Sequence, residues 1–175
     1  MAKIQRFSIF FGLLAFVLGL DQWSKHYAVA HIKGKPTAFY FFDLIQIVYA
    51  ENKGAWGSLG GEWPPLLRQS FLLYLPAIIL LGLAIFLLFK NNVKQTDFLP
   101  LTCIFTGGMG NLIDRFRFNY VVDFLYIGYG PIGTNIFNVA DVVIMIGFSL
   151  LLIYGFLEWK NSRLSKDSTP PAAEN

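Results

Sequence analysis

The sequence predicts an integral membrane protein that is built mainly from α-helices. Hydrophobic residues make up 55% of its 175 residues and charged residues only 14%, whereas soluble domains carry about 25% charged residues. The mean hydropathy is +0.51. A chain of this length forms one domain rather than two. The composition excludes a disordered protein, a soluble nucleic-acid binder and a disulfide scaffold, the last because Cys103 is the only cysteine.

Four apolar segments approach or reach the roughly 20 residues with which a helix crosses a bilayer. The first follows Lys3 and Arg6, and no small-residue cleavage site follows it, so we expect a retained helix rather than a signal peptide. The third is interrupted by threonines and glycines, which suit close helix packing. We therefore expect one membrane domain, residues 1–160, with four transmembrane helices at about 7–30, 66–89, 97–116 and 138–159.

The segment 36–62 has a different pattern. Between Ala38 and Tyr49 it is aromatic and β-branched but too short to span a membrane, which predicts strands. The raw count of basic residues favours neither side, but the short basic flanks of the helices place both termini in the cytoplasm. We therefore expect a small extracytoplasmic β-sheet between helices 1 and 2, resting on the membrane surface. The polar tail 161–175 is expected to be disordered in the cytoplasm.

Ionisable side chains at membrane depth usually mark function. Asp123 is a lone carboxylate in an apolar run, and Asp141 begins the fourth helix, so both are expected at the outer end of the bundle. Two carboxylates brought together can share one proton. One can then deprotonate a water while the other donates a proton to a substrate carbonyl, which is aspartic-protease chemistry.

Both residues also have a structural alternative. Asn138 and Asp141 have the spacing of a capping box, in which the acid also favours the helix dipole. Asp123 can instead form a salt bridge with Arg115 or Arg117. The structural and catalytic interpretations are compatible with one another.

Two further groups of residues are candidates for substrate contact. Asn111 and Arg115 are four apart on one helix face, and the Arg115 guanidinium suits a carbonyl, carboxylate or phosphate. Asn52 can hydrogen-bond an extended peptide backbone, and Gly54 would let that backbone approach closely. Helix packing is the alternative for the glycines of 107–110, and a glycine-rich turn is the alternative for the 52–61 segment.

Other chemistries have weaker support. Asp21 and Lys25 are four apart, which predicts an ion pair within one helix. His26 and His31 have no third ligand nearby, so we expect neither a metal nor another cofactor. A serine–histidine protease would have to pair Ser58 with one of these histidines.

Taken in order, five short blocks resemble the bacterial lipoprotein signal peptidase family, also called signal peptidase II. They cover the chain from Asp21 to Asp141, and after Ala55 the chain departs from the common family pattern. The blocks are Asp21-Gln22 with Lys25; Asn52-x-Gly54-Ala55; Gly107-Gly108-x-Gly110-Asn111-Leu112-Ile113-Asp114-Arg115; Val122-Asp123-Phe124; and Phe137-Asn138-x-Ala140-Asp141.

The resemblance implies an intramembrane aspartyl endopeptidase of the bacterial cytoplasmic membrane, with its site near the extracytoplasmic face. Such an enzyme removes signal peptides from diacylglyceryl-modified prolipoproteins, cutting before the lipid-modified cysteine, and is inhibited by the cyclic peptide globomycin. We expect a monomer that contacts substrate and membrane lipid but no nucleic acid. The implied residues are the catalytic pair Asp123 and Asp141; substrate-binding Asn52, Gly54, Asn111, Arg115, Asn138 and Asp21; and supporting Asp114, Gly108, Gly110, Ala140 and Lys25.

Two other classes of function remain open at this point. A small proton-coupled transporter would use Asp21, Asp114 and Asp141 as a relay, although the chain has no internal repeat of the kind many transporters show. A non-enzymatic assembly factor is the second. Proton flux in liposomes would favour the transporter, and loss of prolipoprotein cleavage on replacing Asp123 or Asp141 would exclude the assembly factor.

Overall fold

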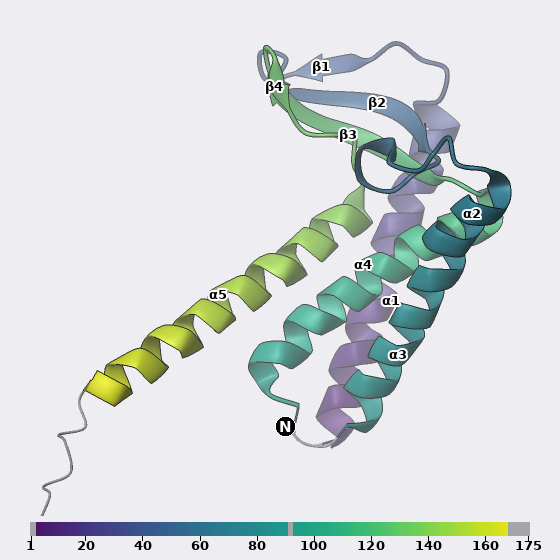
Figure 1. Cartoon of the computed structure of the whole chain (residues 1–175). Helices are drawn as coiled ribbons and strands as arrows, with labels where there is room; N and C mark the ends of the chain where they lie inside the picture. The colour runs from purple at the N-terminus through teal and green to yellow at the C-terminus, as the bar shows by residue number, and fades with distance from the viewer. Residues whose placement is uncertain (1–2, 91–92, 168–175) are drawn as a thin grey trace, which may run out of the picture.

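The computed structural model, which describes residues 3–90 and 93–167, is a bundle of helices with a small antiparallel sheet at one end (Figure 1). The sheet lies at the end of the bundle opposite the N-terminus. The elements, in chain order, are α1 (Lys3–His31), β1 (Ala38–Tyr40), β2 (Ile45–Asn52), the 3-10 turn η1 (Trp56–Ser58), α2 (Pro65–Gln69), the π-helical η2 (Ser70–Tyr74), α3 (Leu75–Phe89), α4 (Gln95–Phe118), β3 (Val121–Tyr129), β4 (Ile132–Gly133) and α5 (Val139–Asp167).

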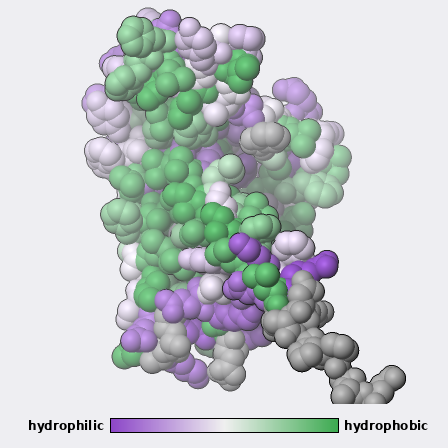
Figure 2. All heavy atoms as spheres, turned by 90° about the vertical axis from the view of Figure 1, so that its left-hand side faces the viewer, coloured by the Kyte–Doolittle hydropathy of each residue, from purple (hydrophilic) through white to green (hydrophobic). Residues whose placement is uncertain are grey.

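Among residues 3–90 and 93–167, three helical segments are long and apolar enough to cross a membrane: Lys3–His31, Pro65–Phe89 and Val139–Leu164. Less than a quarter of the most apolar stretch of each is buried inside the protein, so most of these apolar side chains face outward, as they do in helices that face lipid. Figure 2 shows apolar side chains over the middle of the molecule and hydrophilic ones gathered at the end opposite the sheet. The predicted membrane character and mainly helical fold are confirmed at this level.

The third expected span, 97–116, corresponds to the more polar helix α4, which packs against α1, α3 and α5. Its glycines allow this close packing, as the packing alternative predicted. A Cβ atom on Gly107 would lie 2.5 Å from the Ala140 carbonyl oxygen, and one on Gly110 would lie 2.5 Å from Asp21 Oδ2. On Gly108 it would meet only the flexible end of Leu80. Gly107 and Gly110 therefore set the approach of α4 to α5 and α1.

We expect Gly110→Ala to lower the free energy of unfolding by about 1–3 kcal/mol, the usual cost of overpacking a filled interior. The matched control is Gly12→Ala in α1, where a Cβ atom meets nothing within 4 Å and where alanine should stabilise the helix by about 0.5–1 kcal/mol. Thermal unfolding in detergent measures both changes. Equal shifts in the two variants would contradict the packing role of Gly110.

The sheet has the strand order β1-β2-β3-β4 and is antiparallel throughout. Only β1 and β2 come from the predicted segment 36–62, because β3 and β4 lie between α4 and α5. The expectation of a sheet confined to the segment between helices 1 and 2 is therefore wrong. The available signal for β3 was the run beginning at Val121, which is too short for a helix. It follows Asn119, whose left-handed backbone (φ 62°) ends α4.

Two helical segments have features that the sequence did not predict. The second span contains a π-helical stretch, where the Leu75 N–H donates to Ser70 O, next to Pro76, which has no N–H to continue the regular pattern. Helix α5 continues to Asp167, so the disorder expected from residue 161 is wrong as far as 167. Residues 161–167 contain no proline or glycine and include good helix formers. The rest of that predicted tail, 168–175, lies outside the described residues.

Candidate active site

Asp123 and Asp141 belong to one hydrogen-bonded cluster, although they come from different elements. Asp123 lies on β3 and Asp141 in the first turn of α5. Asn138 contacts both, because its Nδ2 donates to Asp123 Oδ1 at 2.6 Å and its backbone N–H donates to Asp141 Oδ2 at 3.1 Å. The Asp141 N–H in turn donates to Asn138 Oδ1 at 3.0 Å. The capping box is therefore present, and it is also what joins the two acids.

The remaining carboxylate oxygens of the pair accept from two other asparagines. Asn52 Nδ2 donates to Asp123 Oδ2 at 3.1 Å, and Asn111 Nδ2 donates to Asp141 Oδ1 at 2.8 Å. Within residues 3–90 and 93–167, neither acid has an ion-pair partner, so the predicted alternative of a salt bridge from Asp123 to Arg115 or Arg117 is wrong. Neutral amide donors hold the two side chains in place. A cation in direct contact would strongly favour the ionised form of both acids, and these amides carry no such charge.

Asp123 is poorly solvated, with only 2% of its surface exposed. This burial, followed by repulsion from the Asp141 carboxylate, raises the pKa of Asp123 to about 6, against the opposing effect of the Asn52 and Asn138 hydrogen bonds. Asp123 therefore retains a proton to a higher pH than an exposed aspartate, which is what a carboxyl needs to act as a general acid near neutrality.

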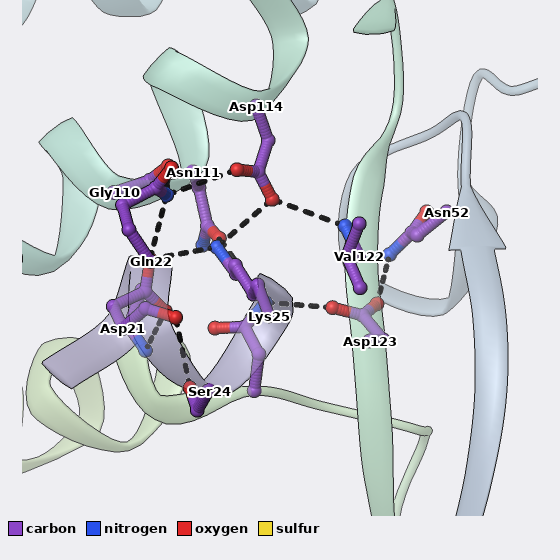
Figure 3. Close-up of polar contacts among 12 residues, drawn as sticks. Asp21, Gln22, Ser24, Lys25, Asn52, Gly110, Asn111, Asp114, Val122 and Asp123 are labelled. Atoms are coloured by element: carbon purple, nitrogen blue, oxygen red, sulfur yellow. Dashed lines mark hydrogen bonds and ion pairs between the residues drawn. The ribbon is translucent and has the colours of Figure 1, made fainter. Parts of the chain in front are cut away.

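A buried ionic cluster centred on Lys25 (Figure 3) is linked to the pair through Asn111, which contacts both Lys25 and Asp141. Lys25 Nζ is 2.9 Å from Asp21 Oδ2 and 3.0 Å from Asp114 Oδ2, and it donates to Asn111 Oδ1 at 3.0 Å. The ion pair predicted from the four-residue spacing of Asp21 and Lys25 is thus confirmed. All three charged side chains are almost fully buried, so each needs the others as compensation.

The two acids of this cluster fix the backbone next to the two site acids. Asp21 Oδ1 accepts the N–H of Ala140, the residue before Asp141, at 2.9 Å. Asp114 Oδ2 accepts the N–H of Val122, the residue before Asp123, at 3.1 Å. The Lys25 cluster therefore positions both β3 and α5 relative to α1 and α4.

Gln22 is a member of this cluster to which the sequence analysis assigned no role. Its Nε2 donates to Asp114 Oδ1 at 3.0 Å and to Asp21 Oδ2 at 3.2 Å, so it links the same two acids that Lys25 links. Its place beside Asp21 in the first sequence block was the available signal.

The loop after β2 is attached to the site through Asn52 and Arg115. The Gly54 N–H donates to Asn52 Oδ1 at 3.1 Å, and Arg115 Nη2 donates to the Gly54 carbonyl at 2.9 Å. A Cβ atom on Gly54 would collide with the backbone of Ser58 and Leu59, so this turn requires glycine. The glycine-rich turn predicted as the alternative for this segment is confirmed, and Arg115 holds it against α4.

Three of the residues expected to contact substrate are buried in the structure. Asp21 and Asn138 are fully buried, and Asn111 is 8% exposed, which is more than Asp123 at 2%. Their hydrogen bonds run to other residues of the site, as given above, so they position the acid pair. Substrate contact by these three residues stays a prediction.

The same contacts leave a proton relay without support. A relay through Asp21 and Asp114 needs groups that exchange protons along a path, but both residues pair with buried Lys25 and hold backbone N–H groups of neighbouring elements. They are tied to a structural role.

Beside Asp123, a cavity of about 500 Å³ opens along the sheet. Its lining includes Asn52 and Asp123 at one end and does not include Asp141. The acid pair therefore meets the cavity on the side of Asp123. The remaining lining residues come from the residue before β1, from β2, from the turn after β2, from β3 and from the segment that leads into α5: Thr37, Gln46, Val48, Ala50, Glu51, Gly57, Ser58, Tyr126, Thr134, Asn135 and Ile136.

Comparisons with known proteins agree on one family. The profile of the family described as signal peptidase (SPase) II matches residues 13–157. A protein of Enterococcus faecalis named lipoprotein signal peptidase is 32% identical over 162 residues, covering 92% of this chain and 96% of that protein. One of the same name from Borrelia turicatae is 38% identical over 152 residues, covering 83% and 86%.

Among solved structures, one described as "Bacterial membrane enzyme structure by the in meso method at 2.3 A resolution" has a TM-score of 0.72. It is 24% identical in sequence, and the match covers 96% of this chain and 94% of that one. This likeness shows a shared fold.

Proposed function

The chain belongs to the signal peptidase II family, and we propose that it is an aspartic endopeptidase that removes signal peptides from diacylglyceryl-modified prolipoproteins. The family match spans residues 13–157 and so includes the whole hydrogen-bonded cluster. Asp123 and Asp141 are the proposed catalytic residues. The cut falls directly before the lipid-modified cysteine.

The observation that carries the proposal is the shared contact of Asn138 with both carboxylates. It brings two acids from separate elements to one point, with a neutral amide between them. Because burial and the charge of Asp141 raise the pKa of Asp123 to about 6, the pair can hold a single proton near neutral pH. A pair with one proton contains a general base and a general acid at once.

The proposed reaction uses both members of that pair. The ionised carboxylate takes a proton from water, the water oxygen attacks the carbonyl carbon of the scissile peptide, and the protonated carboxyl donates to the carbonyl oxygen. The resulting tetrahedral diol collapses, the C–N bond breaks, and a proton from the pair passes to the leaving amine. The products are a signal peptide with a new carboxylate and a lipoprotein that begins with the modified cysteine. No cofactor or metal takes part.

The membrane-facing surface suits a substrate that is itself anchored in lipid. Apolar side chains such as Met145 and Phe148 on α5 face outward, at 65% and 52% exposure, on the helix that begins with the catalytic Asp141. A signal helix can approach from the bilayer along this surface while the acyl chains of the modified cysteine stay in lipid, so apolar contact supplies much of the binding energy.

The proposed topology has four membrane-crossing helices in one domain of residues 1–160: the three apolar segments named above and α4, which is the third in chain order. The short basic flanks support cytoplasmic termini, because they gather at one end: Arg6 Nη1 donates to the Lys90 carbonyl at 2.8 Å, and Lys94 pairs with Glu158 at 2.9 Å. The sheet and the start of α5 lie toward the other end (Figure 1). Asp123 lies on β3 of that sheet and Asp141 in the first turn of α5, so we propose that the acid pair is at the extracytoplasmic face.

A gel-shift assay with purified protein and a diacylglyceryl-modified prolipoprotein tests this function. We expect loss of the signal peptide with the modified substrate, no cleavage of the unmodified form, and inhibition by globomycin, which we propose binds at the acid pair. The proposed active unit is a monomer, so the specific activity should not change with protein concentration. Absence of cleavage by well-folded protein would contradict the proposed function.

The pH dependence of cleavage follows from the raised pKa of Asp123. Above about pH 6 the pair loses its remaining proton, and with it the general acid, so kcat/KM should fall on the alkaline side with an apparent pKa of about 6 that belongs to the pair. Initial rates at low substrate concentration between pH 4.5 and 9 measure this. A rate that already falls near pH 4, as for an ordinary aspartate, would contradict the shared-proton account.

A further inference from the structure

From the position of the cavity beside Asp123, we propose that it binds the first residues of the mature lipoprotein, those that follow the modified cysteine. This inference rests on the proposed function and adds to it a second substrate-binding region, outside the membrane. The region has no part in holding the signal peptide.

The direction of the substrate chain follows from which acid the cavity meets. Asp141 begins the membrane helix α5, whereas Asp123 lies on β3 of the sheet, and only Asp123 lines the cavity. A signal helix that arrives from lipid reaches the pair on the side of α5. The chain beyond the scissile bond must then leave on the side of Asp123, which is where the cavity begins.

The size of the cavity suits a short extended peptide. Its lining runs along β2 from Asn52, beside Asp123, to Gln46, a separation of six residues and therefore about 20 Å along a strand. An extended chain of about six residues covers this length. The volume of about 500 Å³ fits such a segment only if its side chains are small or point outward to solvent.

The chemistry of the lining suits recognition of a peptide backbone. Val48 and Ala50 provide apolar contact, and the lining also carries the carboxamides of Gln46 and Asn135. Besides Asp123, the other polar groups of the lining are Thr37, Glu51, Asn52, Ser58, Tyr126 and Thr134. A carboxamide both donates and accepts hydrogen bonds, so it can bind the N–H and C=O groups of any extended chain. The lining therefore favours a polar, flexible segment without specifying its sequence. An acyl chain or an apolar signal helix would offer these amides no hydrogen-bond partner, and Gln46 would keep its contact with Asp43 O at 3.5 Å.

The test compares two synthetic peptides that carry the same signal sequence and the same diacylglyceryl-cysteine. The short one ends at the cysteine as an amide, and the long one continues for about six small polar residues before its amide. We expect the unchanged enzyme to cleave the long peptide with a kcat/KM at least about fivefold higher, because the added hydrogen bonds lie in the cavity. Equal values for the two peptides would overturn the inference.

Two variants locate the effect. Gln46→Trp fills the far end of the cavity, and Asn135→Ala removes one amide without adding bulk, so each should bring the ratio of long-peptide to short-peptide kcat/KM toward one. Leu44→Trp is the matched control, since it adds the same ring at an exposed position that does not line the cavity, and it should keep the ratio of the unchanged enzyme.

The outcomes separate the two proposals. If the ratio survives in both cavity variants, or if Gln46→Trp slows both peptides equally, the cavity does not bind the mature segment and the inference is overturned. If the unchanged enzyme cleaves neither peptide, the proposed function itself is contradicted.

Discussion

Replacing Asp123 with asparagine should lower kcat for prolipoprotein cleavage by at least about 10³-fold, and Asp141→Asn should do the same, because each change removes either the general base or the general acid. Asparagine keeps the shape of the side chain and cannot exchange a proton, but it also replaces one of the two oxygens that accept hydrogen bonds in the site with an NH2 group. Cleavage assays with a diacylglyceryl-modified prolipoprotein measure the loss. Near-normal turnover in either variant would remove that residue from the catalytic pair.

The folded state of Asp123→Asn can be checked through its pH dependence. Because the pKa of Asp123 is raised from 3.8 to about 6 in the folded protein, the folded state binds this proton more tightly than the unfolded state, and the parent loses stability as the pH rises from about 4 to about 6. The asparagine variant lacks this loss. Its stability relative to the parent should therefore rise by up to about 3 kcal/mol across that window and stay level above it.

Removing the charge of Lys25 should have the largest effect on folding. Lys25→Met keeps the length of the side chain but leaves Asp21 and Asp114 buried without a counter-ion, which should cost about 3–5 kcal/mol. It also releases the two acids that hold the backbone next to Asp123 and Asp141, so activity should fall with stability. Thermal unfolding in detergent and the cleavage assay measure the two losses.

Lys33 provides the matched control for Lys25. It forms an ion pair of similar length, 2.8 Å to Glu51, but both partners are exposed, and such surface pairs contribute little. Lys33→Met should therefore unfold close to the parent temperature.

The triple variant Asp21→Asn, Lys25→Met, Asp114→Asn should recover much of the stability lost in Lys25→Met, because it removes the uncompensated charges. Equal stability of Lys25→Met and Lys33→Met would refute the buried cluster.

The parts of the molecule that the sequence predicted correctly depend on local pattern. Uncharged apolar runs predicted the membrane helices, the spacing of Asp21 and Lys25 predicted an ion pair, and the spacing of Asn138 and Asp141 predicted a capping box. Each of these features involves residues within one turn or one span. Its physical cause is therefore contained in a few adjacent positions.

What the sequence did not predict depends on how distant segments pack. Strand β3 pairs with β2 across more than 70 positions, as in the pairing of Ala50 with Asp123, and no local pattern indicates that partner. The same holds for burial. Asn111 and Asn138 are polar residues whose burial follows from the packing of α4 against α5, and spacing along the chain does not indicate it.

The central claim is that Asp123 and Asp141 together hold the tetrahedral oxygen formed at the scissile carbonyl. The most direct test is the binding of an uncleavable lipid-modified peptide in which a hydroxymethylene group, –CH(OH)–, replaces that carbonyl, measured against the same peptide with –CH₂–. The account predicts that the hydroxyl tightens binding to the unchanged protein by at least about 10²-fold, as for transition-state analogues, and that this gain disappears in both Asp123→Asn and Asp141→Asn. Binding that is equal for the two peptides, or a gain that survives either substitution, would contradict it.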